Sequence, residues 1–227
     1  MAEEVLSMPT QNTNTMAALQ GLRHGDSSVR LRAALAMGTA PDPRYVDGLI
    51  ERCAVEPEFF VRDMLTWAIT RHPAPLTVPK LTEELRSERA QARSQALHTL
   101  SKVGDRQAWS AITRAHLTDA SDEVARSAWR AAVVLVPEAA KPELAEALAT
   151  QLGRGGRDTQ LSLSQALIAL GDEAEPALHA ATTHSLVPVR QHAVATQRLA
   201  RDPDAVFEFA LDEAKRIVAL GPGRQEE

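Results

Sequence analysis

One arginine-centred signature recurs along this chain at nearly constant spacing. It consists of a small or β-branched residue, an arginine, and alanine or a larger apolar residue three positions later, and it occurs at Arg30, Arg62, Arg93, Arg126 and Arg190. Successive arginines lie 32, 31 and 33 residues apart and then 64, which is two periods. We expect the missing copy near residues 158–160, where Gly156–Gly171 keeps the apolar-Gly ending but lacks the arginine. A fixed period of this length is typical of repeat proteins whose units stack on their neighbours.

Each period divides into two amphipathic segments with helical spacing of apolar residues. The second segment begins at the arginine signature, and the first carries its own apolar stripe, as in Val46, Leu49, Ile50 and Cys53. Asp42-Pro43 places a capping carboxylate before a proline at the first helical position. Gly38, Gly104, Gly153 and Gly171 lie where helices should end. Aromatic residues are only 4% of the chain, which favours closely packed helices over strands.

The Asp-x-x-Val-Arg-x-x-Ala pattern of Asp26–Ala33 resembles the HEAT repeat, and the short period resembles its bacterial phycobilisome-lyase type. This resemblance implies an all-α, right-handed solenoid of about six helix pairs over residues 15–220, with flexible segments at 1–14 and 221–227. The second-helix signatures fall near 30, 62, 93, 126, 160 and 190, and a capping helix is expected at 203–220. The Gly153–Gly156 stretch is interpreted as a loop inside a repeat and not as a domain boundary. For function, the family implies binding and scaffolding.

The repeated arginines, Arg30, Arg62, Arg93, Arg126 and Arg190, are predicted to be structural. A device that fixes the stacking of repeats must recur in every period, whereas a ligand site is local. Acidic residues precede four of the arginines and are the expected partners: Asp26, Glu58, Glu88 and Asp122.

A binding face is predicted on the side of the second helices that points away from the first helices, which is the concave surface of a HEAT-like solenoid. Its candidate partner-binding residues are Asp63, Trp67, Arg71, Gln95, His98 and Lys102. Trp67 and His98 hold the same position in adjacent repeats, so the two side chains could meet. A tryptophan among polar groups suits a binding hot spot. The alternative is that Trp67 only fills space between helices. Ser94, Ala128, Ala131 and His192 are expected on the same face.

No catalytic or metal motif is found in the sequence. The seven histidines are followed by Gly25, Pro73, Thr99, Leu117, Ala180, Ser185 and Ala193, never by the glutamate that the di-iron site of HEAT-like deoxyhypusine hydroxylases needs. Cys53 is the only cysteine, so neither a disulfide within the chain nor a Cys-based metal site can form. We therefore expect a non-enzyme without cofactor or metal. Two alternatives remain: a HEAT-like DNA-base-binding protein or alkylpurine DNA glycosylase relative using Asp63 and Trp67, and a small-ligand pocket between the second and third repeats.

The charge balance and the N-terminus bear on partners and location. The chain carries 25 basic and 30 acidic residues, a formal net charge of −5, which disfavours nucleic acid as the general partner. The first residues contain two glutamates where a signal peptide carries positive charge, and no apolar run is long enough to span a bilayer. The sequence therefore predicts a cytoplasmic protein that binds a protein or peptide and does not act at a membrane.

Overall fold

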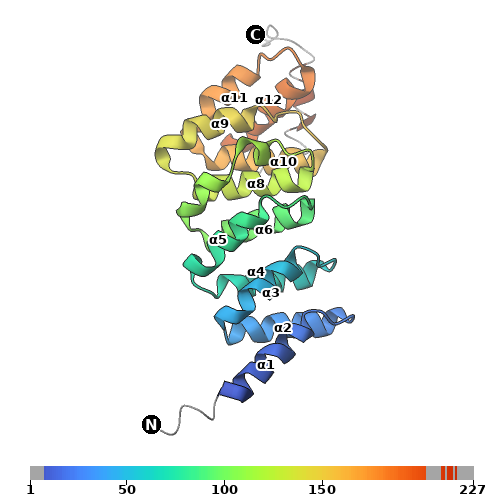
Figure 1. Cartoon of the computed structure of the whole chain (residues 1–227). Coiled ribbons are helices and arrows are strands. Elements are labelled where there is room, and N and C mark those ends of the chain that lie inside the picture. Colours follow the sequence, from blue (N-terminus) through green and yellow to red (C-terminus); the bar gives the residue numbers. More distant parts are fainter. Residues whose placement is uncertain (1–7, 203–210, 213, 217, 219–227) are drawn as a thin grey trace, which may run out of the picture. The chain divides into compact units, whose positions relative to one another are not determined.

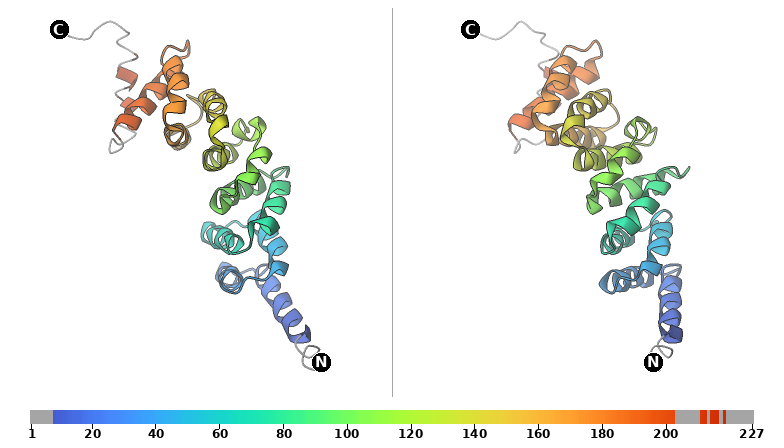
Figure 2. Two further views of the ribbon diagram at one scale, coloured as in Figure 1. Left: turned by 90° about the vertical axis from the view of Figure 1, so that its left-hand side faces the viewer. Right: turned by 60° about the vertical axis from the view of Figure 1, so that its left-hand side comes forward.

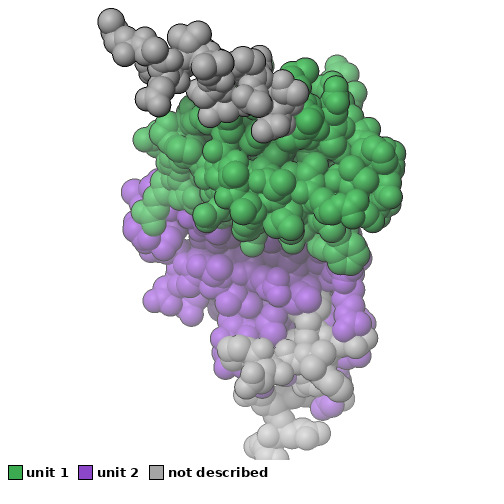
Figure 3. Space-filling model, turned by 90° about the horizontal axis from the view of Figure 1, so that it is seen from below, with its two compact units in different colours: residues 1–111 green, residues 112–227 purple. Residues whose placement is uncertain are grey.

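The computed structural model describes residues 8–202, 211–212, 214–216 and 218, with side chains from Thr15 onward. All regular structure in this part is helical, and it contains no strand. The chain has the HEAT-repeat-like solenoid fold that the arginine period predicts (Figure 1). It divides into two compact units, residues 1–111 and residues 112–227 (Figure 3). The division falls within the fourth repeat and not at Gly153–Gly156.

Unit 1 contains three helix pairs in its described part. They are α1 (Met8–Gly21) with α2 (Ser27–Thr39), α3 (Val46–Cys53) with α4 (Phe59–Thr70), and α5 (Ala74–Glu84) with α6 (Ala90–Val103). Two 3-10 turns, η1 (Pro43–Tyr45) and η2 (Arg106–Ala111), complete it. The second helices α2, α4 and α6 pack on one another in order, and Figure 2 shows them stacked along one side of the unit. The helix α1 begins at Met8, inside the 1–14 segment that was expected to be flexible.

Unit 2 repeats this arrangement of helix pairs. Its described pairs are α7 (Arg114–Leu117) with α8 (Asp122–Leu135), α9 (Lys141–Ala149) with α10 (Arg157–Ala169), and α11 (Glu175–Ala181) with α12 (Val187–Arg201). The 3-10 turns η3 (Glu138–Ala140) and η4 (Gly171–Ala174) precede α9 and α11. Most of the predicted capping helix at 203–220, and the tail 221–227, lie outside the described residues. Within that segment Ala214 is fully buried and packs with Ala195 of α12.

The core follows the predicted stripes in both helices of a repeat. The first-helix residues Val46, Leu49, Ile50 and Cys53 are buried, as are the second-helix residues Val61, Leu65 and Ile69 of α4. Asp42 caps η1 by accepting a hydrogen bond from the Arg44 backbone N–H at 2.9 Å. Gly104 ends α6 in the left-handed conformation, with φ of 71°, which costs glycine nothing. The sequence therefore predicted the helix pairing and these buried stripes correctly.

Candidate functional site

The signature arginines are positioned by the turn that precedes each second helix. In α2, α4, α6 and α12 the arginine is the fourth residue of the helix: Arg30, Arg62, Arg93 and Arg190. In each case Nη1 donates hydrogen bonds to the two backbone carbonyls that lie three and two residues before the helix starts. Arg30 bonds to His24 and Gly25 at 2.9 and 2.8 Å, and Arg190 bonds to His184 and Ser185 at 2.7 and 2.9 Å. The equivalent bonds of Arg62 and Arg93 span 2.6–3.0 Å.

The degenerate fifth repeat keeps half of this contact. Gln160 is the fourth residue of α10, and its Nε2 donates to the Gly155 carbonyl at 3.3 Å. The side chain of glutamine is shorter than that of arginine and reaches only one of the two carbonyls. The predicted position near residues 158–160 was therefore correct, although the sequence did not reveal that a glutamine takes the arginine's place.

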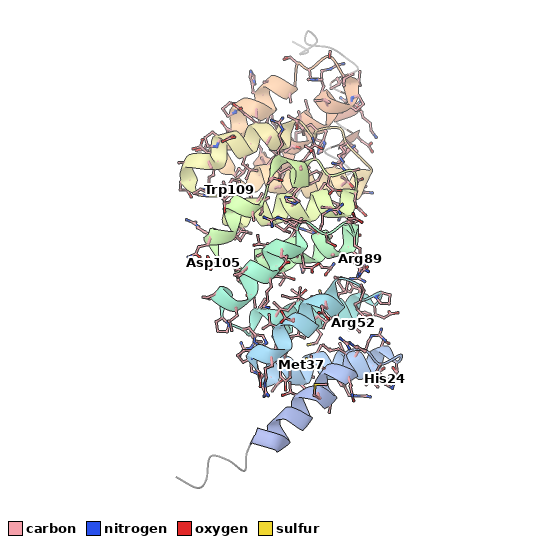
Figure 4. The ribbon with its side chains drawn as sticks, in the orientation of Figure 1. His24, Met37, Arg52, Arg89, Asp105 and Trp109 are labelled. Atoms are coloured by element: carbon pink, nitrogen blue, oxygen red, sulfur yellow. The ribbon has the colours of Figure 1, made fainter. Side chains whose placement is uncertain are left out.

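The first two repeats are joined by a buried charge cluster that the sequence did not predict. Glu56 is fully buried in the turn before α4 and accepts paired hydrogen bonds from Arg30 of α2 at 2.7 Å and one bond from Arg52 of α3 at 2.7 Å. Burial alone raises the pKa of Glu56, but the hydrogen bonds from Arg30 and Arg52 outweigh it and lower the pKa to about 2. The expected partner Asp26 instead caps α2 by accepting from the Ser28 backbone N–H. Figure 4 shows His24, Arg52 and Arg89 along the edge of unit 1 where these turns lie.

Arg126 departs from the pattern of the other signature arginines. It is the fifth residue of α8, not the fourth, and its buried Nε has no hydrogen-bond partner in the described part of the chain. Ala125 holds the fourth position. Arg154, from the turn before α10, supplies the missing guanidinium: it donates to the Asp119 carbonyl and to Asp122 and lies over the Trp129 ring at 6.0 Å.

The predicted face is best developed on α4, where one exposed stripe runs down the helix. Phe60, Asp63, Trp67 and Arg71 recur at intervals of three and four residues, so they share one side. We call these four residues the α4 stripe. Phe60 is 75% exposed and Trp67 is 38% exposed. Leu35, which holds in α2 the position that Trp67 holds in α4, is 45% exposed. The sequence prediction did not include Phe60, which lies two residues before Arg62, or Leu35, which lies five residues after Arg30.

Trp67 packs backward onto the preceding repeat. A Cβ built on Gly38 of α2 would lie 2.2 Å from the Trp67 ring, so the ring rests where Gly38 leaves room. Gly38 therefore lies inside α2, in its last turn, and its role is to admit a side chain rather than to end the helix. The space-filling interpretation of Trp67 is half right, because one part of the ring is covered and another part is exposed.

The α6 residues of the predicted site are placed less uniformly. Lys102 is exposed, whereas Gln95 and His98 are half-buried. The oxygen of Gln95 accepts a weak hydrogen bond from the Cys53 thiol at 3.8 Å, which draws this side chain toward α3. Burial raises the pKa of Cys53 to about 12, so the thiol stays protonated and unreactive at neutral pH.

Four further residues expected on the face are buried: Ser94, Ala128, Ala131 and His192. His192 joins α12 to the preceding repeat, since Nδ1 accepts from the Gly153 backbone N–H at 3.0 Å and Nε2 lies 2.9 Å from the Gln160 carbonyl. Burial lowers the pKa of His192 to about 4 and keeps the ring neutral. Ala128 and Ala131 lie in α8, which starts one residue earlier relative to its arginine, and a change of one residue rotates the exposed side of a helix by 100°.

Cavities in unit 1 bear on the small-ligand alternative. The space between the second and third repeats, beside Ile50, Cys53 and Gln95, has a volume of about 10 Å³, enough for one water at most. This cavity is too small to hold a small molecule. A larger groove of about 430 Å³ lies between α1 and α3. In the described residues no group of three or more His, Cys, Asp or Glu side chains could hold a metal ion, and no described helix is long and apolar enough to cross a membrane.

Comparison with known proteins supports the fold. No family model matches the chain, and no curated protein matches it in sequence. Among solved structures, the karyopherin Kap121p bound to the extreme C-terminus of the protein phosphatase Cdc14p matches with a TM-score of 0.59 and 20% identity, over 89% of this chain and 25% of that one. The chain thus spans about a quarter of the length of Kap121p. It has a HEAT-like repeat fold.

Two further matches are weaker. Human deoxyhypusine hydroxylase is 18% identical with a TM-score of 0.47, covering 91% of this chain and 96% of that one. The CpcE and CpcF complex of phycocyanin lyase from Nostoc sp. PCC7120 is 15% identical with a TM-score of 0.40, covering 89% and 93%. At these scores neither match carries an argument about function.

Proposed function

We propose that this protein is a non-catalytic scaffold that binds a protein or peptide partner along its second-helix face, in the cytoplasm. The observation that carries the proposal is the α4 stripe, where Phe60 and Trp67 stay exposed beside the charged residues Asp63 and Arg71. Large aromatic side chains left in water on one face, with charges beside them, are typical of a surface that a partner covers. Kap121p, which has a similar fold, was solved bound to the extreme C-terminus of Cdc14p and to Nup53p, which supports a protein or peptide as the partner.

The stripe is suited to a peptide. Trp67 is held by its contact with Gly38, so part of its ordering cost is already met before binding. Phe60 and Leu35 add apolar area on either side of it, one on the same helix and one on the neighbouring helix α2. Asp63 and Arg71 offer one charge of each sign within a turn of Trp67, which can fix the direction of a bound chain. Gln95, His98 and Lys102 extend the proposed site onto α6.

The test is to select peptides from a random display library on the intact protein and to measure their affinities by fluorescence anisotropy. We expect Phe60→Ala and Trp67→Ala each to weaken binding about tenfold or more, the usual effect of losing a hot-spot aromatic. Leu76→Ala is the matched control, because Leu76 is a 39% exposed apolar residue on α5, a first helix. Selected peptides that bind both aromatic variants as tightly as the wild type would refute the proposed site.

A further inference from the structure

An equivalent exposed stripe runs along α8 in unit 2, and its chemistry differs from that of α4. Counted from the helix start, Phe60, Asp63, Trp67 and Arg71 of α4 correspond to Glu123, Arg126, Arg130 and Val134 of α8. Glu123 and Arg130 are exposed, Arg126 is half-buried and Val134 is 50% exposed. Two arginines one turn apart therefore occupy the positions that carry Asp63 and Trp67 in α4.

The two guanidiniums make few contacts with the rest of the described chain. Among the described residues, the buried Nε of Arg126 has no hydrogen-bond partner, and Arg130 donates a hydrogen bond from Nη2 to the Ser127 hydroxyl at 3.3 Å. Neither arginine takes part in an ion pair within the described part of the chain. Partial desolvation and then repulsion from Arg126 lower the pKa of Arg130 below its usual value, although it stays protonated at neutral pH.

This arrangement is unusual within the protein itself. Arg30, Arg62, Arg93 and Arg190 all donate to carbonyl oxygens, and Arg154 fills the equivalent place before α8. The turn before α8 therefore has no need of Arg126. A half-buried guanidinium with an unpaired Nε raises the free energy of the folded chain unless an anion meets it.

We propose that Arg126 and Arg130 form an oxyanion site on unit 2 that binds a carboxylate side chain of an acidic peptide segment. The planar guanidinium of arginine binds carboxylates through paired N–H donors. Two guanidiniums one helical turn apart can bind a single carboxylate or two neighbouring ones. Gln165 is exposed at the position of α10 that corresponds to Arg130, and α10 packs against α8, so an amide donor borders the site.

The neighbouring residues favour a carboxylate over a phosphate. Glu123 and Asp158 are both exposed at the second position of α8 and α10, on the same side as the arginines. Their negative charge repels a phosphate dianion or a nucleic-acid backbone more strongly than a single carboxylate. Beyond Arg130, Val134 offers an apolar contact. The complementary ligand is a segment with acidic residues followed by a large apolar residue.

The site consists of unit 2 residues alone, so it stands independently of the partner site proposed on unit 1. The probe is a doubly capped, labelled peptide of alternating glutamate and leucine, compared with its glutamine counterpart by fluorescence anisotropy at low salt. Binding of the glutamate peptide should weaken about tenfold or more in Arg126→Gln and in Arg130→Gln. Arg114→Gln, an exposed arginine of α7, is the matched control and should leave binding unchanged. All variants should keep the wild-type circular dichroism spectrum.

A residue-specific signal separates this site from general charge attraction. In NMR spectra the Nε–Hε resonance of Arg126 should shift on addition of the glutamate peptide and not of the glutamine peptide. Equal binding of both peptides, or equal binding to wild type and the Arg126→Gln/Arg130→Gln double variant, would overturn the proposal. Inorganic phosphate that displaces the peptide at lower concentration than acetate would also overturn it, because the site would then be a phosphate site.

Discussion

The turn before α4 and the turn before α8 are both held by arginine side chains, but the arginines come from different repeats. Before α4, the buried carboxylate of Glu56 accepts hydrogen bonds from Arg30 of α2 and from Arg52 of α3. Arg62 donates to the backbone carbonyls of the same turn. Before α8, the guanidinium comes from the following repeat, since Arg154 reaches back to Asp119 and Asp122. The first turn is held by its own and the preceding repeat, and the second by the following one.

The difference explains how one sequence signature can hold two roles. Arg62 and Arg126 belong to the same sequence signature, yet α8 starts one residue earlier relative to its arginine than α4 does. That single residue moves Arg126 from the turn to the exposed side of the helix. Arg154 already donates hydrogen bonds to the turn before α8, so Arg126 is not needed there. The arginine signature therefore stabilises the turns before α2, α4, α6 and α12, whereas in α8 it places an arginine on the surface.

The largest expected effect is on the turn before α4. Glu56→Gln should lower the free energy of unfolding by about 3–5 kcal/mol, because it leaves the buried Arg30 without its counter-charge. Urea unfolding at neutral pH measures this loss. Glu58→Gln is the control, since Glu58 lies in the same turn but is exposed, and its effect should stay within about 0.5 kcal/mol. Similar effects of the two substitutions would show that the buried pair of Glu56 and Arg30 does not hold the turn before α4.

Acid should weaken the two units in different pH ranges. The folded-state pKa of His192 is lowered from 6.5 to about 4, so its neutral form stabilises unit 2 above pH 6.5 and that contribution is lost as the pH falls toward 4. The pKa of Glu56 is lowered from 4.5 to about 2, so its contribution to unit 1 is lost only between those values.

Between pH 7 and pH 5 we therefore expect α12 to lose about 2 kcal/mol of protection in hydrogen exchange, while α4 changes little. His192→Gln should flatten this response, since it removes the titrating ring. If α4 and α12 lose protection together between pH 7 and pH 5, the assignment of these groups to separate units is wrong.

A smaller effect is expected at the turn before α8. Arg154→Gln removes the ion pair with Asp122, the bond to the Asp119 carbonyl and the contact with the Trp129 ring, but the pair is partly exposed. We expect a loss of about 1–2 kcal/mol, measured by thermal unfolding. Arg114→Gln, on the same unit, should change stability by less than about 0.5 kcal/mol. A loss as large as that of Glu56→Gln would show that both turns are held equally.

Much of the fold could be predicted from the sequence, because the 32-residue period and the apolar stripes are local patterns. The buried Val61, Leu65 and Ile69, and the first-helix stripe of Val46 and Cys53, followed directly from helical spacing. The Glu56 cluster could not be predicted, since a glutamate in a turn is usually exposed, and only the packing of two repeats brings Arg30 and Arg52 to it.

The candidate site was predicted in part. Asp63, Trp67, Arg71 and Lys102 are exposed as expected, whereas Ser94 and His192 are buried. Counting from the arginine assumes that every second helix starts at the same offset. The start of α8 violates that assumption, and Gln160 hides the offset of α10. Counting from the capping residue at each helix start would have placed Arg126 on the same side of its helix as Asp63 of α4.

The most direct test of this account compares the unfolding free energies of Arg30→Gln and Arg126→Gln in urea at neutral pH. The two arginines belong to the same sequence signature, and the same substitution is made in both. We predict a loss of about 3 kcal/mol or more for Arg30→Gln, which breaks the buried pair with Glu56, and a change within about 0.5 kcal/mol for Arg126→Gln. Equal losses for the two variants would contradict the account, because Arg126 would then be a stacking arginine like the others.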